Sequence, residues 1–407
     1  MLPHWPVTLE PHPNDHFSGE CRVIRILPSL LKRLAQLGYL DIERVGESSD
    51  VEDAEVHASL DSIADLLIER RQAPVSGEIE YDTPKDAMEA CLARFNDHDL
   101  TSEERDILKQ MRPWAAETYT RLAPAFALRK QQGFGGQRLG IARSDVAADV
   151  AGIAAECLSY DQLRSANLIV DRYLEITGDF DMLRVLAYFI AYECLRKAES
   201  VMDDPESRVA YLREAGWLSE FRVPYLLIGT GVSGSGKSEF TYSAMRELGG
   251  IRVRSTVERA RLVGKPTANT PEDHTDEITD KTYRRIARIT GTLLESGYPV
   301  YIDATCMTRE QRYILRNEAQ ARGLAVMIVS FEADTDTLEA RLTHRQKKRG
   351  QPPQAALDVL HEQQAQFENF TEEELFHLVH IDTTAKDANQ QLVALIRDNL
   401  RPEVAYG

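Results

Sequence analysis

The chain has 407 residues, 43% of them hydrophobic and 28% charged, and it carries a formal net charge of −17. A chain of this length and composition should fold into about two or three globular domains, each able to bury its own core. The negative charge repels nucleic acids and anionic membranes at long range, so binding to either would need a local basic groove.

The sequence shows no pattern for membrane insertion or secretion. Its longest apolar runs, VPYLLIG and AVMIVSF, are far shorter than a membrane-spanning helix needs. The first residues, MLPHWPVTLEPHPNDH, have neither the basic nor the apolar region of a signal peptide. The scattered cysteines form no Cys-x-x-Cys pair, which favours reduced thiols over disulfides or a zinc site. We therefore expect a soluble, cytoplasmic protein that does not bind membranes.

Hydrophobic periodicity divides the chain into three parts. Residues 1–82 show little periodicity and are expected to form a poorly defined N-terminal segment. Residues 83–218 have an almost wholly helical pattern. Residues 219–407 alternate apolar strands with helices, which is typical of a parallel sheet covered on both faces. The sequence thus predicts an α/β fold, with a three-layer α/β/α domain preceded by a mainly α-helical domain.

Local signals predict several boundaries in the helical part. Thr83 is placed as an N-cap, with Pro84 at the first helical position. Thr101 and Glu104 have the spacing of a capping box, and Pro113 should bend or break the helix that follows. After a glycine-rich break at 133–140, helices are expected near 143–158, 160–176 and 180–202.

Apolar runs in the last part predict strands at 223–229, 250–255, 299–305, 324–332 and 377–383. The segment 264–282 has no diagnostic pattern and is expected to be a loop that faces the substrate.

The most specific motif is GVSGSGKS at 231–238, between a predicted strand and a predicted helix. Its spacing, G-x-x-x-x-G-K-S, is that of a phosphate-binding loop, in which glycines let backbone N–H groups surround phosphate oxygens. Lys237 should reach the β and γ phosphates, and Ser238 should supply its hydroxyl to Mg²⁺. We therefore expect ATP and Mg²⁺ as cofactors. The predicted nucleotide-binding residues are Gly231, Ser233, Gly234, Ser235, Gly236, Lys237, Ser238 and Glu239.

Asp303 ends the strand VYID, at the edge of the sheet where α/β proteins bind ligands. Its carboxylate could hold Mg²⁺, or it could instead cap the next helix; the spacing favours the metal role.

Two further groups of residues surround the predicted site. After the second strand come Ser255, Thr256, Glu258 and Arg259, at the corner where phosphate-loop kinases hold the phosphate acceptor. The stretch RLTHRQKKRG places Arg341 and Arg345 on a basic helix that could form a lid and neutralise charge in the transition state. The alternative is a solvated helix end stabilised by the helix dipole.

The segments GVSGSGKS, RVRSTVERARL, VYIDATCMTREQR and RLTHRQ together resemble the polynucleotide-kinase-like group of phosphate-loop kinases. More closely, they resemble the C-terminal half of bacterial proteins described as fused aminoglycoside-phosphotransferase-like and ATP-binding (AAA-type) proteins. The resemblance covers about residues 220–385. It implies metal-side and substrate-side places for Asp303, Thr305 and Arg312, and lid places for Arg341 and Arg345.

The resemblance to this family also implies an origin for the helical part, residues 83–218, in a phosphotransferase-like domain. Residues on both sides of 135–141 resemble the helices that flank the phosphotransferase catalytic loop, but only GGQRLGI joins them here. The loop's Asp, Asn and metal-binding Asp are therefore missing, so the resemblance implies a degenerate phosphotransferase-like domain that keeps helices but cannot catalyse.

The chain also differs from the family pattern at the corner that would hold the phosphate acceptor. The family pattern has Ser-Asp where this chain has Ser255-Thr256, and a threonine cannot act as the base at neutral pH. Glu258 or Asp303 could substitute, transfer could be slow, or the protein could hydrolyse ATP without an acceptor.

The leading interpretation is an Mg²⁺-dependent ATP kinase that acts on an unidentified hydroxyl, with Lys237, Asp303, Arg259, Arg341 and Arg345 as catalytic residues. Thr256, Glu258, Arg259, Thr305 and Arg312 would face the acceptor. An alternative is a nucleotide-dependent switch whose helical domain binds a protein partner. A third is a polynucleotide 5′-hydroxyl kinase, which the net charge disfavours.

Overall fold

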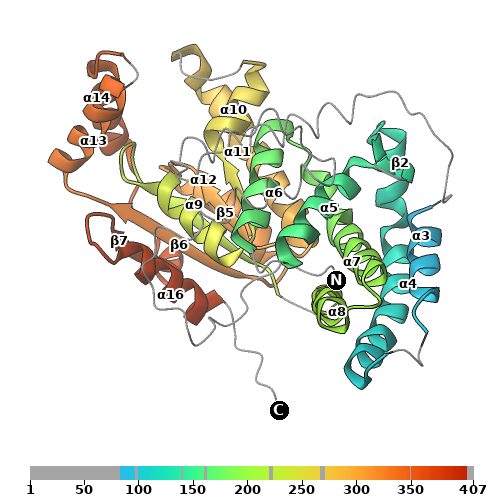
Figure 1. Ribbon diagram of the computed structural model, residues 1–407. Helices are drawn as coiled ribbons and strands as arrows, with labels where there is room; N and C mark the ends of the chain where they lie inside the picture. The colour runs from blue at the N-terminus through green and yellow to red at the C-terminus, as the bar shows by residue number, and fades with distance from the viewer. Residues whose placement is uncertain are drawn as a thin grey trace. The chain divides into compact units, whose positions relative to one another are not determined.

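A computed structural model describes residues 83–96, 100–138, 141–159, 163–219, 223–265, 271–348 and 350–400. The chain separates into two compact units, Met1–Arg222 and Val223–Gly407, which are coloured blue to green and yellow to red (Figure 1). The segment 1–82 lies outside the described residues. Within the described ranges no helix is long and apolar enough to cross a membrane.

The first unit is a helical assembly. Its helices are α3 (Pro84–Ala93), α4 (Ser102–Gln131), α5 (Val146–Ser159), α6 (Leu163–Thr177), η3 (Phe180–Met182), α7 (Leu183–Ser200) and α8 (Pro205–Leu218). Most residues of α7 are buried, and this helix packs against α5 and α8. The predicted caps are confirmed: Thr83 accepts from the N–H of Asp86, and Thr101 forms a capping box with Glu104.

A buried ion pair helps to hold this unit together. Arg129, only 1% exposed, donates to Asp145 at 2.6 Å and to Asp179 at 2.7 Å. Both carboxylates bind the guanidinium through two nitrogens, the geometry in which a buried charge is best compensated.

Of the two helix interruptions expected in this unit, the structure shows no break at Pro113, whereas the glycine-rich stretch at 133–140 does separate two helices. Helix α4 runs without a break through Pro113 and also Pro124. Pro113 lies on an exposed face, where the carbonyl that loses its hydrogen bond can reach water. The glycine-rich stretch predicted as a break contributes to an antiparallel hairpin of β1 (Gly135–Arg138) and β2 (Ile141–Asp145).

The second unit contains a parallel sheet with the strand order β4-β5-β3-β6-β7. The strands are β3 (Tyr225–Thr230), β4 (Ile251–Arg254), β5 (Val300–Asp303), β6 (Ala325–Glu332) and β7 (Leu378–Asp382). Strands β3 and β5 are buried along their whole length, which explains why their sequences are continuous apolar runs. The predicted α/β fold is confirmed.

Helices cover both faces of the sheet (Figure 1). Helices α9 (Lys237–Leu248) and α16 (Ala388–Leu400) pack together on one face, and α11 (Asp276–Glu295) and α12 (Arg309–Gln320) on the other. This arrangement follows from right-handed crossovers between parallel strands.

The remaining helices lie in the segments that connect β4 to β5 and β6 to β7. They are α10 (Ser255–Val263), η4 (Pro271–His274), α13 (Thr335–Lys348), α14 (Gln354–Gln366) and α15 (Glu372–Leu375). The prediction of a loop over 264–282 is therefore wrong in part, because α11 begins at Asp276 with Thr275 as its N-cap.

Candidate nucleotide-binding site

The loop at 231–236 connects the central strand β3 to helix α9, as a phosphate-binding loop must. Gly231, Gly234 and Gly236 have positive φ angles of 138°, 85° and 95°. A Cβ at Gly231 would lie 2.6 Å from the carbonyl oxygen of Phe331, so that position accepts only glycine. Gly236 is the N-cap of α9, and its lack of a side chain leaves the helix N-terminus open toward the loop.

Lys237 lies under the loop rather than in solvent. Its side chain is 8% exposed, and its Nζ donates to the Val232 carbonyl at 2.9 Å and to Ser235 Oγ at 3.4 Å. The pKa of Lys237 is lowered to about 8, mainly by burial and in part by the charge of Arg345, whereas Asp303 and Cys306 oppose the shift. Ser235 is also buried, and Glu239 is exposed in the first turn of α9.

Ser238 and Asp303 form the centre of the candidate metal site. The Ser238 hydroxyl donates to Asp303 Oδ1 at 3.0 Å, and Arg254 lies 3.4 Å from Oδ2. Asp303 is 6% exposed and ends β5 beside the central strand. A hydroxyl and a carboxylate oxygen at this separation are hard ligands of the kind that Mg²⁺ binds, so these residues fit the ion.

Thr305 follows Asp303 in a turn that contacts the phosphate loop. The Thr305 carbonyl accepts from the N–H of Gly231 at 3.2 Å and from the hydroxyl of Thr230 at 2.9 Å. The predicted metal-side residues and the phosphate loop are therefore joined by hydrogen bonds.

The acceptor corner lies on α10, directly after β4. Thr256 is exposed there. Arg259 contacts His274 and Thr279, and it forms no ion pair with a carboxylate among the residues described. Burial lowers the pKa of Arg259. A cation without a carboxylate partner on this side is consistent with the predicted acceptor-facing position.

Glu258 does not face the acceptor, contrary to the prediction. Its side chain is 1% exposed and forms ion pairs with Arg261 and Arg285, the latter at 2.7 Å. Two guanidinium groups occupy its carboxylate, so Glu258 is poorly placed to accept a proton from a substrate.

Arg312 is likewise a structural residue and not a substrate contact. It is fully buried and pairs with Glu374 at 2.7 Å. It also donates to the carbonyls of Cys306, Met307, Glu368 and Asn369 and stacks over Phe370. The resemblance gave Arg312 a substrate-side place, whereas in the structure its donors are used within the fold.

The predicted lid helix α13 contacts the phosphate loop directly. Arg341 donates to the Gly234 carbonyl at 3.1 Å and to the Thr383 hydroxyl at 2.9 Å. Arg345 is exposed, one helical turn later, and its charge acts on Lys237. Of the two predicted lid residues, Arg341 therefore contacts the loop directly.

Sequence reasoning missed Gln363 on α14. Its side-chain Oε1 accepts from the backbone N–H of Ser233 at 2.7 Å, so an amide group occupies one of the donors predicted to bind phosphate. Leu338, Leu342 and Leu360 form a buried cluster with Val232 of the loop, which holds α13 and α14 against it. The local sequence around Gln363, VL-x-x-Q, does not predict this contact. The contact forms only because the folded chain brings α14 next to the loop.

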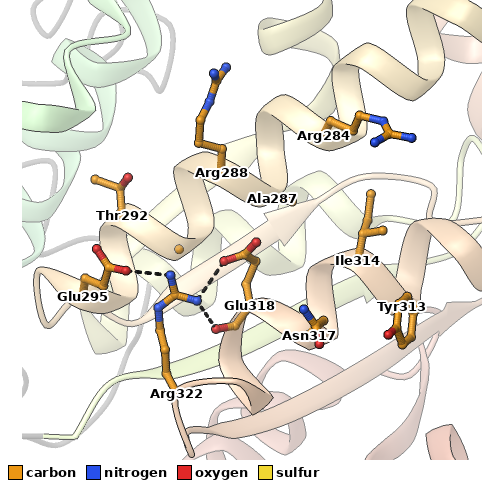
Figure 2. Close-up of a pocket in the computed structure, with 11 residues that line it drawn as sticks. Arg284, Ala287, Arg288, Thr292, Glu295, Tyr313, Ile314, Asn317, Glu318 and Arg322 are labelled. Atoms are coloured by element: carbon orange, nitrogen blue, oxygen red, sulfur yellow. Dashed lines mark hydrogen bonds and ion pairs between the residues drawn. The ribbon is translucent and has the colours of Figure 1, made fainter.

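A separate pocket of about 550 Å³ lies between α11 and α12. Figure 2 shows Arg322 between Glu295 and Glu318, with contacts of 2.7 Å and 2.8 Å. Gly291 leaves room for this pairing, since a Cβ there would lie 2.4 Å from Glu318. The pocket contains none of the predicted site residues.

Comparisons with known proteins place the resemblance in the second unit. Residues 226–370 match the family model described as an AAA domain. No curated protein sequence matches the chain significantly.

Among solved structures, a gluconokinase from Sinorhizobium meliloti is similar at 22% identity and a TM-score of 0.32, over 44% of this chain and 93% of that one. The Mycobacterium tuberculosis APS kinase, in complex with AMPPNP and APS, is similar at 16% identity and a TM-score of 0.34, over 44% and 99%. Shikimate kinase from Acinetobacter baumannii, in complex with shikimate, is similar at 19% identity and a TM-score of 0.31, over 44% and 96%.

Proposed function

We propose that residues 223–407 form a kinase that binds ATP and Mg²⁺ and transfers the γ-phosphoryl group to a hydroxyl acceptor. The observation that carries this proposal is the hydrogen bond between Ser238 and Asp303, with Lys237 buried beneath the same loop. These are the three groups that phosphoryl transfer requires around the β and γ phosphates.

The chain's own residues would act mainly by positioning and by neutralising charge. The loop N–H groups and Lys237 would hold the phosphate oxygens, and Ser238 and Asp303 would hold Mg²⁺. The ion would supply positive charge between the β and γ phosphates. Arg345, which is exposed on α13 one turn after Arg341, would approach the charge that develops during transfer.

The acceptor would enter beside Thr256 and Arg259. No carboxylate of α10 is available there as a base, because Glu258 is held by two arginines. We therefore expect slow transfer, or an acceptor whose proton leaves without a dedicated base, which a loose transition state permits.

A second candidate is an ATP-hydrolysing switch. The exposed Thr256 in place of an acidic residue favours it, since water could then take the place of a specific acceptor. In this case the first unit, which we propose to be a catalytically inert phosphotransferase-like domain, would present its helices to a protein partner.

The test is transfer of label from γ-labelled ATP, with Mg²⁺, into an extract of metabolites and RNA. Wild type and Lys237→Ala are compared side by side. A labelled metabolite that depends on Lys237 supports the kinase, and labelled RNA would identify a polynucleotide kinase. Labelled free phosphate alone supports the switch. Turnover that survives Lys237→Ala would refute both proposals and locate catalysis elsewhere in the chain.

A further inference from the structure

The turn after β5 contains a strained residue. Cys306 has a φ of 48° and is the only non-glycine residue in the described ranges with a positive φ. Residues with a Cβ rarely adopt this conformation, so surrounding contacts must enforce it. The Cys306 N–H donates to the Tyr283 hydroxyl at 2.9 Å, and its carbonyl accepts from Arg312 at 3.1 Å. Such strain is typical of functional sites and calls for an explanation here.

Tyr283 reaches this turn from α11, on one flank of the sheet. Its side chain is 2% exposed, and its hydroxyl lies 3.3 Å from Thr305 Oγ1. A phenol has one proton to donate, and a buried hydroxyl normally finds an acceptor for it. Because the Tyr283 oxygen already accepts from Cys306, its proton is best placed on Thr305 Oγ1.

This arrangement decides what Thr305 can do. With Tyr283 as the donor in this pair, the Thr305 hydroxyl oxygen is the acceptor and its own proton is available to another group. Burial raises the pKa of Tyr283, so the phenol stays a donor at all physiological pH values. Thr305 itself is partly exposed, unlike its neighbours Ala304 and Cys306, and can therefore reach a ligand.

The ligand within reach is the one held by the phosphate loop. The Thr305 carbonyl bonds to Gly231, the first residue of the loop, and Thr305 follows Asp303 by two residues. The Lys237 Nζ donates to the Val232 carbonyl and to Ser235 Oγ of the same loop. In a loop of this kind the lysine contacts the β and γ phosphates.

We propose that Tyr283 is a positioning residue, which directs the Thr305 hydroxyl as a hydrogen-bond donor toward the terminal phosphate of a bound nucleoside triphosphate. The inference rests on the proposed function, since it requires a triphosphate in the loop. The Thr305 hydroxyl would thus help the site to distinguish ATP from ADP, because only ATP has the γ-phosphate that this donor would contact. Neither Lys237 nor the loop backbone supplies this distinction alone.

The experiment measures the dissociation constants of ATP and ADP, both with Mg²⁺, by titration calorimetry. The proteins are wild type, Tyr283→Phe, Thr305→Val, Thr305→Ser and the Tyr283→Phe/Thr305→Val double variant. Loss of a hydrogen bond to a charged group should weaken ATP binding by about tenfold in Thr305→Val. Tyr283→Phe should weaken it less, and ADP binding should not change. Thr305→Ser keeps the hydroxyl and should keep the preference for ATP.

The double variant tests whether Tyr283 acts through Thr305. If it does, the double variant binds ATP no more weakly than Thr305→Val, because the two effects are not additive. Tyr298→Phe is the matched control: Tyr298 is fully buried, and its hydroxyl makes no hydrogen bond with the described residues. Its removal should leave both dissociation constants unchanged.

Equal losses for ATP and ADP, or no loss in either Thr305→Val or Tyr283→Phe, would overturn the inference. If Tyr283→Phe does not fold, Thr305→Val still tests the donor because that side chain is partly exposed. Failure of the wild type to bind either nucleotide would instead refute the proposed function, and the inference with it.

Discussion

The Ser238 hydroxyl and the Asp303 carboxylate lie 3.0 Å apart although 65 residues separate them in the chain. The first follows the central strand β3 and the second ends its neighbour β5, so the parallel pairing of these strands brings the two groups together. The candidate metal site is thus a consequence of sheet order, and it should respond to changes in either residue.

Asp303→Asn keeps the shape of the side chain and an oxygen that can accept from Ser238, but it removes the negative charge. We expect the affinity for Mg²⁺, in the presence of ATP, to fall by roughly 10- to 100-fold or more. Titration of turnover against Mg²⁺ concentration measures this change. Asp382→Asn, at the end of the edge strand β7, serves as the control, because among the described residues this exposed carboxylate accepts hydrogen bonds from Thr384 alone. An unchanged Mg²⁺ requirement in Asp303→Asn would contradict the assignment.

The binding of ATP should depend on pH through Lys237. Burial lowers the pKa of this residue to about 8, so in the free protein the amine loses its charge as the pH rises through that value. ATP affinity should therefore be highest below pH 8 and should decline above it. Calorimetric titrations from pH 7 to 9 test this, and Lys237→Ala should show weak binding with no such decline.

The same shift predicts a change in stability with the opposite sign. Between the folded pKa of about 8 and the ordinary lysine value of 10.5, the unfolded chain binds more protons than the folded one. The free energy of unfolding should therefore increase as the pH rises from about 8 to 10.5. This increase should be missing in Lys237→Ala. Urea unfolding of both proteins at pH 8 and at pH 10 gives the comparison.

Arg312→Met should reduce stability rather than catalysis directly. It leaves the Glu374 carboxylate, 3% exposed, without its cation. Breaking one side of a buried pair costs about 3–5 kcal/mol. Urea unfolding should show this loss, and Arg312→Met/Glu374→Gln should recover part of it because the unpaired charge is removed. If Arg312→Met kept full stability but lost turnover, Arg312 would instead be a substrate contact, as the sequence predicted.

Gln363→Ala should strengthen nucleotide binding. In the free protein the Gln363 side chain accepts from the Ser233 N–H at 2.7 Å, and phosphate must replace it there. Removing a competing hydrogen bond of about 0.5–1.5 kcal/mol should lower the dissociation constant of ATP by roughly 3- to 10-fold. Gln364→Ala is the control, since the adjacent amide contacts Thr335 and not the loop. Weaker binding in Gln363→Ala would mean that this amide holds the nucleotide and does not compete with it.

The sequence predicted those features that depend on local pattern. The strand, loop and helix around 231–238 and the caps at Thr83 and Thr101 required only spacing and residue type. No break forms at Pro113, because whether a proline breaks a helix depends on whether the affected carbonyl can reach water, which is a tertiary property. Glu258 and Arg312 were predicted to face the acceptor, but their side chains pair with Arg285 and Glu374, which lie 27 and 62 residues away in the chain. Contacts between residues so far apart in the chain cannot be predicted from the local sequence pattern. Gln363, which contacts Ser233, was missed for the same reason.

The contact of Arg341 with Thr383 has a consequence for the order of folding. The loop that begins at Gly231 is completed by a residue near the end of the last strand, about 150 residues later in the chain. During synthesis on a ribosome, the glycine-rich turn would emerge well before the groups that surround it. Contacts of such long range form late, so a nascent chain that ends before β7 should not yet bind nucleotide.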